Sequence, residues 1–268
     1  MWDMNPLTQL LKNKGVDTHI ETSGAYPLSG TWDWICLSPK KIKLPTNKND
    51  LAFYSIRELG EFIKHRQISC VELTQFFIDR LKKHDKTLSC VISYTEERAL
   101  ERARWADKEV AAGRYRGELH GIPFGVKDLF ASKDAKTTWG SMPFKNQQFE
   151  NDATVIGKLE RGGAILIAKL SMGSLAWGDV WFDGKTKNPW SPTEGSSGSS
   201  AGSAAAVSAG LLPFAIGTET LGSIVSPSTV CGVTGFRPTY GTISRKGAMA
   251  LSWSMDKVGP IARSAEDC

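Results

Sequence analysis

The feature that most constrains the fold is a long, almost uncharged segment rich in glycine and serine. The 49 residues from Asn188 to Phe236 include ten serines and eight glycines, and only Glu194 and Glu219 carry a charge. A flexible linker can have a similar composition. This segment, however, also contains an alanine-rich stretch at 204–207 and an apolar stretch at 211–217, which linkers lack. We interpret it as a loop, a small-residue helix, a strand and a second loop that build a buried polar site from backbone amides and hydroxyls.

Periodic apolar residues in the rest of the chain predict helices that alternate with strands. Residues 55–58 (SIRE) and 69–72 (SCVE) have the capping-box pattern, and apolar residues follow each at helical spacing. We expect Thr95 to cap a third helix that ends near Gly113, and a fourth helix over 152–161. Apolar runs predict buried strands at 88–94, 122–129, 164–168 and 211–217. This alternation predicts an α/β protein with a largely buried sheet.

The first part of the chain has a different character. Residues 1–52 contain four prolines and little periodicity. We therefore expect an irregular N-terminal extension over 1–52 and one α/β domain over 53–268.

Composition and charge exclude several classes of function. Lys and Arg number 33 and Asp and Glu 28, so the net charge is only +5, and no long basic run favours binding to nucleic acid or to a membrane surface. The five cysteines are scattered without a CxxC pair and there are four histidines, so neither a disulfide framework nor a zinc site is expected. With no signal peptide and no 18-residue apolar stretch, we expect a cytoplasmic protein with free thiols, no membrane association and no cofactor.

A search for a nucleophilic serine finds one motif at once. Residues 198–202 (GSSAG) match the G-x-S-x-G pattern of the α/β-hydrolases. That mechanism needs a histidine after the serine, but all four histidines precede it. The base would then be a lysine, a carboxylate or a metal-bound group. Lys127 is a candidate because it lies in the apolar run 121–130, although it could instead reach the surface or pair with Asp128.

Three groups of residues, taken together, resemble the amidase signature family. They are 197–207 (SGSSAGSAAAV), 217–224 (GTETLGSI) and 121–128 (GIPFGVKD), in the order that the family has. Residues 188–190 (NPW), 235–239 (GFRPT) and 256–260 (DKVGP) are also similar to it. The resemblance covers about residues 53–268. It implies an amidase-signature fold, in which a central mixed sheet has helices on both faces, and a chain that is the N-terminal part of a longer domain.

The resemblance also implies a Ser–Ser–Lys triad that hydrolyses a carboxylic amide through an acyl-enzyme. Ser223 matches the nucleophile, Ser199 the serine held by a cis peptide bond, and Lys127 the base, while Ser199 and Ser200 remain competing candidates for acylation. The implied oxyanion hole consists of the backbone N–H groups of Thr220, Leu221, Gly222 and Ser223. The implied supporting loop contains Gly198, Ser200 and Gly202.

The sequence departs from the family pattern around the nucleophile. Glu219 and Leu221 replace an aspartate and a glycine, and Val225 stands where an arginine is often found. Leu221 could crowd the oxyanion hole or turn its side chain away from it. These departures argue against a close match to the glutamyl-tRNA amidotransferase A subunit.

Three classes of function fit these observations. The first is an amidase that acts on a small-molecule amide without nucleic acid, membrane or metal, and it could form a homodimer. The second is an amidotransferase-type subunit that handles glutamine ammonia within a complex. The third is a catalytically silent scaffold of the same fold, against which the presence of Lys127, Ser199 and Ser223 argues. A phosphate-binding loop is disfavoured because no G-K-[ST] follows the Gly/Ser segment.

Overall fold

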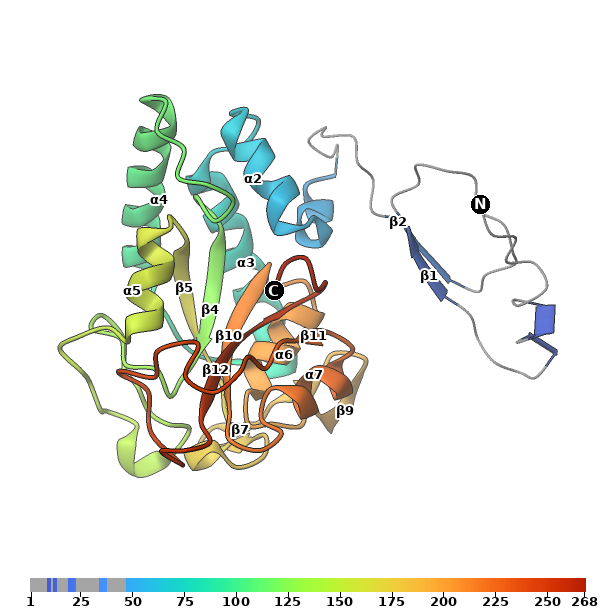
Figure 1. Cartoon of the computed structure of the whole chain (residues 1–268), viewed down its shortest axis with the longest axis vertical. Coiled ribbons are helices and arrows are strands. Elements are labelled where there is room, and N and C mark those ends of the chain that lie inside the picture. Colours follow the sequence, from blue (N-terminus) through green and yellow to red (C-terminus); the bar gives the residue numbers. More distant parts are fainter. Residues whose placement is uncertain (1–8, 11, 14–18, 23–33, 38–46) are drawn as a thin grey trace. The chain divides into compact units, whose positions relative to one another are not determined.

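A computed structural model describes residues 9–10, 12–13, 19–22, 34–37 and 47–268 (Figure 1). The chain divides into two units, residues 1–44 and 45–268. In the first unit, strand β1 (His19–Thr22) pairs in parallel with β2 (Trp34–Leu37). Most of the expected N-terminal extension lies outside the described residues, and the boundary at 52/53 stays a prediction.

A six-stranded mixed sheet forms the centre of the second unit. Its strand order is β11-β12-β10-β4-β5-β3. Strand β4 (Pro123–Lys127) pairs in parallel with both β5 (Ile165–Leu170) and β10 (Phe214–Glu219). The outer strands β3 (Val91–Tyr94) and β12 (Lys257–Ala262) pair antiparallel to β5 and β10, and β11 (Thr234–Gly235) pairs antiparallel to β12. Because β4, β5 and β10 are buried along their whole length, they are almost uniformly apolar, as expected for central parallel strands.

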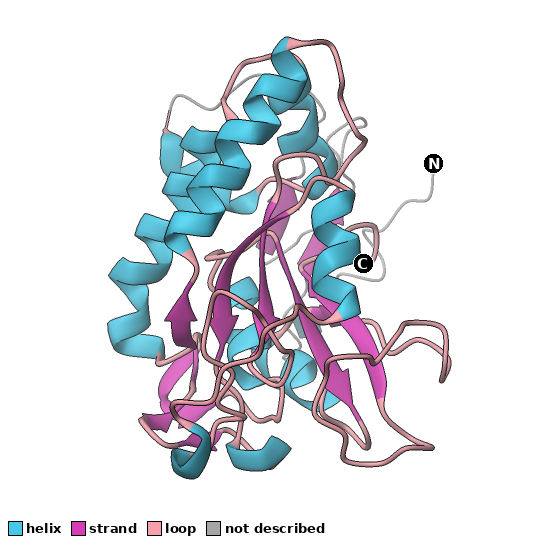
Figure 2. Cartoon of the chain, turned by 90° about the vertical axis from the view of Figure 1, so that its left-hand side faces the viewer, coloured by secondary structure: helices cyan, strands magenta, loops and turns pink. Residues whose placement is uncertain are grey.

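Helices pack on both sides of this sheet, as the family resemblance predicts (Figure 2). They are α2 (Ile56–Lys64), α3 (Cys70–Leu88), α4 (Glu96–Ala111), α5 (Thr154–Arg161), α6 (Ala201–Ser208) and α7 (Val225–Cys231). Short 3-10 helices occupy Lys48–Phe53, Met142–Phe144 and Ser174–Ala176. Two small antiparallel pairs complete the unit, β6 (Val180–Trp181) with β7 (Gly184–Lys185) and β8 (Lys187–Asn188) with β9 (Ser191–Gly195). In the described part of the chain, no helix is both long and apolar enough to cross a bilayer.

Both predicted capping boxes are present. The hydroxyl of Ser55 accepts from the Glu58 N–H and that of Ser69 from the Glu72 N–H, while each glutamate accepts from its serine N–H. Thr95 stands at the N-cap position of α4, as predicted, but its side chain does not cap the helix. Its hydroxyl instead donates to the Leu166 carbonyl in the sheet at 2.8 Å. Thr95 therefore joins helix α4 to the sheet.

Several predicted strands have shifted ends. Helix α3 continues to Leu88 and stops at Ser89, whose backbone is left-handed, so β3 begins only at Val91. Strand β10 begins at Phe214 and reaches Glu219, past the predicted end at Gly217. The strand carrying Lys127 ends at that residue, because the chain turns after it. The apolar runs located the strands, but turn geometry set their limits.

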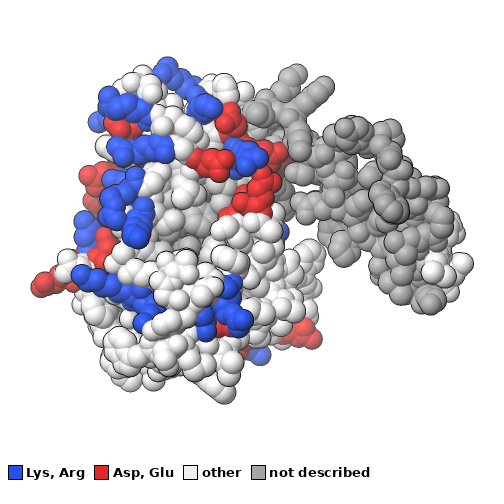
Figure 3. Space-filling view, viewed as in Figure 1, with Lys and Arg blue, Asp and Glu red and all other residues white. Residues whose placement is uncertain are grey.

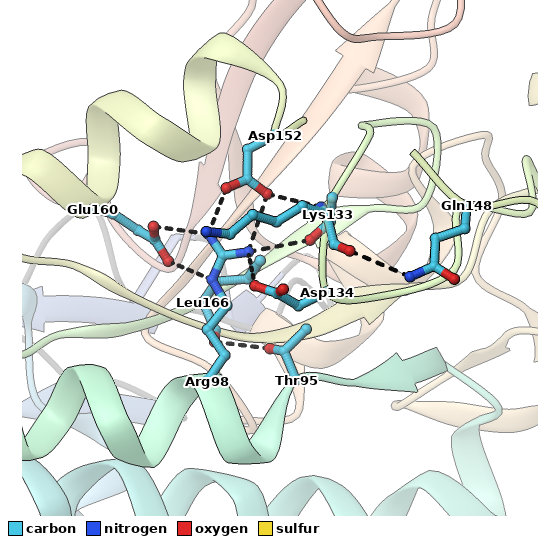
Figure 4. A network of polar contacts seen from close by, with 9 residues as sticks. Thr95, Arg98, Lys133, Asp134, Gln148, Asp152, Glu160 and Leu166 are labelled. Carbon is cyan, nitrogen blue, oxygen red and sulfur yellow. Dashed lines mark hydrogen bonds and ion pairs between the residues drawn. The ribbon is translucent and has the colours of Figure 1, made fainter. Parts of the chain in front are cut away.

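An arginine-centred network holds α4 against α5 (Figure 4). The Arg98 guanidinium, only 9% exposed, binds Glu160 of α5 through Nε and Nη2 at 2.9 and 2.8 Å. It also binds Asp152 at 2.7 Å and Asp134 at 3.1 Å. Burial alone would lower the pKa of Arg98, but its hydrogen bonds to Asp152 and Glu160 raise it overall. The guanidinium therefore stays charged and joins the loop that follows β4 to both helices.

Candidate active site

Part of the predicted site lies where two neighbouring parallel strands end. Lys127 is the last residue of β4, and Glu219 is the last residue of β10. Because the two strands are parallel and paired from Phe124 with Phe214 to Val126 with Ile216, their carboxyl ends share one edge of the sheet. Ligand sites in open α/β sheets lie at this edge.

Lys127 is fully buried and makes three polar contacts. Its Nζ lies 2.7 Å from Ser199 Oγ, 3.0 Å from Thr218 Oγ1 and 3.4 Å from the Thr218 carbonyl oxygen. Burial lowers the pKa of Lys127 to about 7, although the negative charges of Asp256 and Glu219 act in the opposite direction. Desolvation disfavours the ammonium, so a large fraction of this lysine is neutral near pH 7.

Asp128, the next residue, forms hydrogen bonds and an ion pair with other residues than Lys127. Its Oδ1 accepts from Lys169 Nζ at 2.7 Å, and both side chains of this pair are completely buried. Its Oδ2 accepts from the N–H and the hydroxyl of Thr138 at 2.7 and 2.6 Å. Asp128 therefore does not neutralise Lys127, and neither of the alternative explanations for Lys127, surface exposure or pairing with Asp128, holds.

The Gly/Ser segment lies against Lys127. The Gly198–Ser199 peptide bond is cis, as the resemblance implies, and Ser199 is buried against Lys127. A side chain at Gly198 would meet the Gly178 carbonyl oxygen at 1.8 Å, and one at Gly202 the Cys90 carbonyl oxygen at 2.3 Å. Both positions of the predicted supporting loop thus require glycine because another segment's backbone lies against them.

Ser200 has a structural role in this loop. Its hydroxyl donates to the Thr218 carbonyl at 3.1 Å and accepts from the Thr218 N–H at 3.2 Å. Its N–H donates to the Ser223 carbonyl at 3.1 Å. The loop is thereby joined to β10 and to the turn that follows, and the Ser200 hydroxyl is occupied by backbone groups.

Ser223 lies in the turn between β10 and α7. It is half-buried, and its hydroxyl has no hydrogen-bond partner within residues 47–268. Gly222 has a left-handed backbone, with φ of 91°, which favours glycine. The Leu221 side chain is 82% exposed and so does not crowd the turn. Within the same residues, the N–H groups of Thr220, Leu221 and Ser223 donate to no backbone carbonyl outside the sheet ladders.

Two carboxylates lie close to this turn, those of Glu219 and Asp256. Glu219 is buried, and its Oε2 accepts from the N–H groups of Ile224 and Val225, both at 2.9 Å, while its Oε1 accepts from Arg237 at 3.0 Å. Burial would raise the pKa of Glu219, but these hydrogen bonds lower it overall. In the sequence, Glu219 is notable only as one of the two charged residues of the Gly/Ser segment.

Asp256 is the second carboxylate, and it lies just before β12. Its Oδ1 accepts from the Thr220 hydroxyl at 2.5 Å, and its Oδ2 accepts from the N–H groups of Leu251 and Ser252. The neighbouring Lys257 donates to the Thr220 carbonyl at 3.1 Å. Thr220 is therefore held through both its side chain and its carbonyl.

A pocket of about 400 Å³ opens beside these residues. Thr218, which receives the Lys127 hydrogen bonds, lines it together with Asp256 and Lys257. The remaining wall consists of Val258 of β12 and residues of the loop between β11 and β12: Arg245, Lys246, Gly247, Ala248, Met249, Ala250, Leu251 and Trp253. Among the described residues, no group of three or more His, Cys, Asp or Glu side chains is placed to hold a metal ion.

Comparison with known proteins supports the fold and identifies the family. Residues 72–268 match the Amidase family. The chain belongs to the amidase signature family. It is 47% identical over 216 residues to the A subunit of the glutamyl-tRNA(Gln) amidotransferase of Coxiella burnetii, covering 80% of this chain and 44% of the relative. It is 43% identical over 220 residues to the protein of the same name from Legionella pneumophila, covering 81% and 45%.

Solved amidase structures share the fold. The native peptide amidase from Stenotrophomonas maltophilia matches with a TM-score of 0.76 at 34% identity, over 85% of this chain and 47% of that one. Fatty acid amide hydrolase matches with a TM-score of 0.78 at 28% identity, over 84% and 41%. The chain spans less than half the length of each of these relatives.

One sequence prediction is corrected by the comparison. The substitutions at 219, 221 and 225 predicted no close match to the glutamyl-tRNA amidotransferase A subunit, and that prediction is wrong. The identity extends over 216 residues, whereas the substitutions change only a few positions.

Proposed function

We propose that the protein hydrolyses a small carboxylic amide through a Ser223 acyl-enzyme, with Ser199 and Lys127 as its proton path. The observation that carries the proposal is the 2.7 Å contact between a buried Lys127 Nζ and Ser199 Oγ, with the pKa of Lys127 lowered to about 7. A general base works best when its pKa lies near the working pH. Burial brings the pKa of Lys127 into this range, so the site needs no histidine as its base.

The proposed reaction conserves protons at each step. Ser223 Oγ attacks the amide carbon while its proton passes to Ser199 Oγ, and the proton of Ser199 passes to neutral Lys127. When the tetrahedral intermediate collapses, the C–N bond breaks and the proton passes from Lys127 through Ser199 to the leaving nitrogen. Water then attacks the acyl-Ser223 ester and gives a proton to Lys127 through Ser199. As the ester C–O bond breaks and the carboxylic acid leaves, that proton returns through Ser199 to Ser223 Oγ.

Backbone donors in the turn would stabilise the oxyanion. The N–H groups of Thr220, Leu221 and Ser223 are the strongest candidates, because the Glu219 carboxylate also draws on the N–H of Gly222. Fixed donors of this kind act without reorganising during the reaction. The 400 Å³ pocket that Thr218 lines has the volume of a small-molecule site.

Turnover of a simple aryl amide, measured as released aryl amine, tests this function. We expect Ser223→Ala and Lys127→Ala to lower kcat by several orders of magnitude. His120 provides the control, because it is buried at a separate place, where its Nε2 contacts the Ala106 carbonyl oxygen at 3.0 Å. The proposal fails if folded Lys127→Ala protein keeps full turnover while His120→Ala loses it.

A second candidate is an amidotransferase-type subunit that releases ammonia from glutamine within a complex. It is favoured by the 47% identity to a glutamyl-tRNA(Gln) amidotransferase A subunit. The same triad would act, so the two candidates differ in substrate and partner. Ammonia release from glutamine that appears only with an added partner would favour the second candidate. A catalytically silent scaffold would not react with a fluorophosphonate probe, which labels activated serines.

We further propose a cytoplasmic protein that acts on a small molecule and not on nucleic acid. Cys70, Cys90, Cys231 and Cys268 are free thiols, as expected in a reducing compartment. Basic and acidic side chains are interspersed over the upper part of the face drawn in Figure 3, whereas nucleic-acid-binding surfaces concentrate positive charge. Homodimer formation remains a proposal, which measurement of the molar mass in solution tests.

A further inference from the structure

The Glu219 carboxylate bridges the two ends of the turn that contains Ser223. Glu219 is the last residue of strand β10, and its Oε2 accepts from the N–H groups of Ile224 and Val225 at the start of α7. Its other oxygen is held by Arg237 Nη1 at 3.0 Å. The Glu219 side chain is completely buried, whereas that of Arg237 is 51% exposed. This ion pair therefore connects the buried turn to a side chain at the protein surface.

We propose that Arg237 is a positioning residue for the amidase reaction: it holds the Glu219 carboxylate beneath the Ser223 turn and balances its negative charge beside Lys127. This inference rests on the proposed function. Arg237 need not touch the substrate, because it acts through Glu219.

The negative charges near Lys127 affect its protonation, so their neutralisation by nearby cations matters for the reaction. Glu219 and Asp256 both stabilise the Lys127 ammonium, whereas the proposed reaction needs the neutral amine. Asp128 is not part of this balance, because it forms a closed buried pair with Lys169.

Each of the two carboxylates has a cation close by. Arg237 contacts Glu219 directly, and Lys257, next to Asp256 in the chain, binds the carbonyl of Thr220. Asp256 is also occupied by the Thr220 hydroxyl and two backbone N–H groups. Of the two carboxylates, only Glu219 forms an ion pair with a cation among residues 47–268.

Removing one or the other member of this pair has opposite consequences. In Arg237→Gln the Glu219 charge is no longer balanced, so the Lys127 ammonium is stabilised and its deprotonation moves to higher pH. In Glu219→Gln an anion is lost and deprotonation moves to lower pH, while the amide oxygen of glutamine can still accept from the turn. We expect shifts of about 0.5 to 1 pH unit, moderated for Arg237 by its exposure to solvent.

Two measurements on the whole protein report the pH at which Lys127 loses its proton. The first is the pH dependence of the second-order rate of labelling by a fluorophosphonate. The second is the pH titration of 13Cε-labelled lysines by NMR, in which the signal missing from Lys127→Met identifies Lys127. Arg237→Lys should restore the wild-type midpoint. Arg104→Gln, an equal charge change at an exposed position of α4, should leave it unmoved.

Opposite movement of the midpoint in Arg237→Gln and Glu219→Gln supports the inference, since a merely structural defect would lower the labelling rate without such a pattern. Midpoints that stay in place, or that move in the same direction, overturn it. If the wild-type protein takes up no probe but the NMR midpoints move in opposite directions, the proposed function fails and the charge balance stands. In wild-type protein, added salt should screen Arg237 and move the midpoint toward that of Arg237→Gln.

Discussion

Replacing the buried lysine should stabilise the protein while abolishing its activity. Burial lowers the pKa of Lys127 from 10.5 to about 7. At 1.36 kcal/mol per pH unit, this gap corresponds to about 5 kcal/mol of native-state destabilisation below pH 7. Lys127→Met removes this cost and keeps most of the side-chain volume, but it loses the hydrogen bonds to Ser199 and Thr218, worth about 1–3 kcal/mol together. We therefore expect a net gain in the free energy of unfolding at pH 7.

The pH dependence of this gain is its distinguishing feature. Between pH 7 and 10.5 the unfolded chain binds a proton at Lys127 that the folded protein has released, so wild-type stability rises with pH across this window. The advantage of Lys127→Met over the wild type should accordingly shrink by about 1.4 kcal/mol per pH unit between pH 7.5 and 9.5.

Urea unfolding of both proteins at pH 7.5, 8.5 and 9.5 measures this difference directly. Lys108→Met, at an exposed position of α4, is the matched control, and its stability difference should not depend on pH. A constant difference between Lys127→Met and the wild type over this range would refute the argument that Lys127 is largely neutral in the folded protein.

Three further outcomes follow from the same contacts. Ser200→Ala should lower the free energy of unfolding by about 1–3 kcal/mol, because its hydroxyl satisfies two groups of Thr218, while Ser223→Ala should leave urea stability within about 0.5 kcal/mol. Leu221→Ala should keep kcat/KM within about threefold of the wild type in the aryl amide assay, because the side chain points to solvent; a hundredfold loss would mean that it contacts the substrate. Arg98→Met should destabilise the protein by about 3 kcal/mol in urea unfolding, since it leaves Asp152 and Glu160 without their partner, and it should leave the pH midpoint of probe labelling unchanged.

The sequence predicted the elements better than it predicted their contacts. Capping boxes at Ser55 and Ser69 are local patterns, so the helix starts could be read directly. Thr95 has the same residue type as a common cap, yet its hydroxyl turns to a carbonyl of β5, a contact set by how α4 meets the sheet. Strand ends were shifted for a similar reason, since they depend on pairing partners far away in the chain.

The candidate site shows the same limit. The unusual composition of the Gly/Ser segment and the lysine in an apolar strand indicated where the chemistry lies, and the structure places Lys127 against Ser199. Arg237 and Asp256 could not be assigned roles from spacing, because they reach Glu219 and Thr220 from segments that follow the turn by more than ten residues. The orientation of Leu221 was likewise undecided until the turn geometry was known.

The most direct test of the central claim is to identify the acylated residue. The protein is treated with a fluorophosphonate probe at pH 8, digested and analysed by mass spectrometry, with Lys127→Met as the comparison. We predict one adduct, on Ser223, and much slower labelling in Lys127→Met. An adduct on Ser199 or Ser200 in place of Ser223, or equal labelling of the lysine variant, would contradict the account.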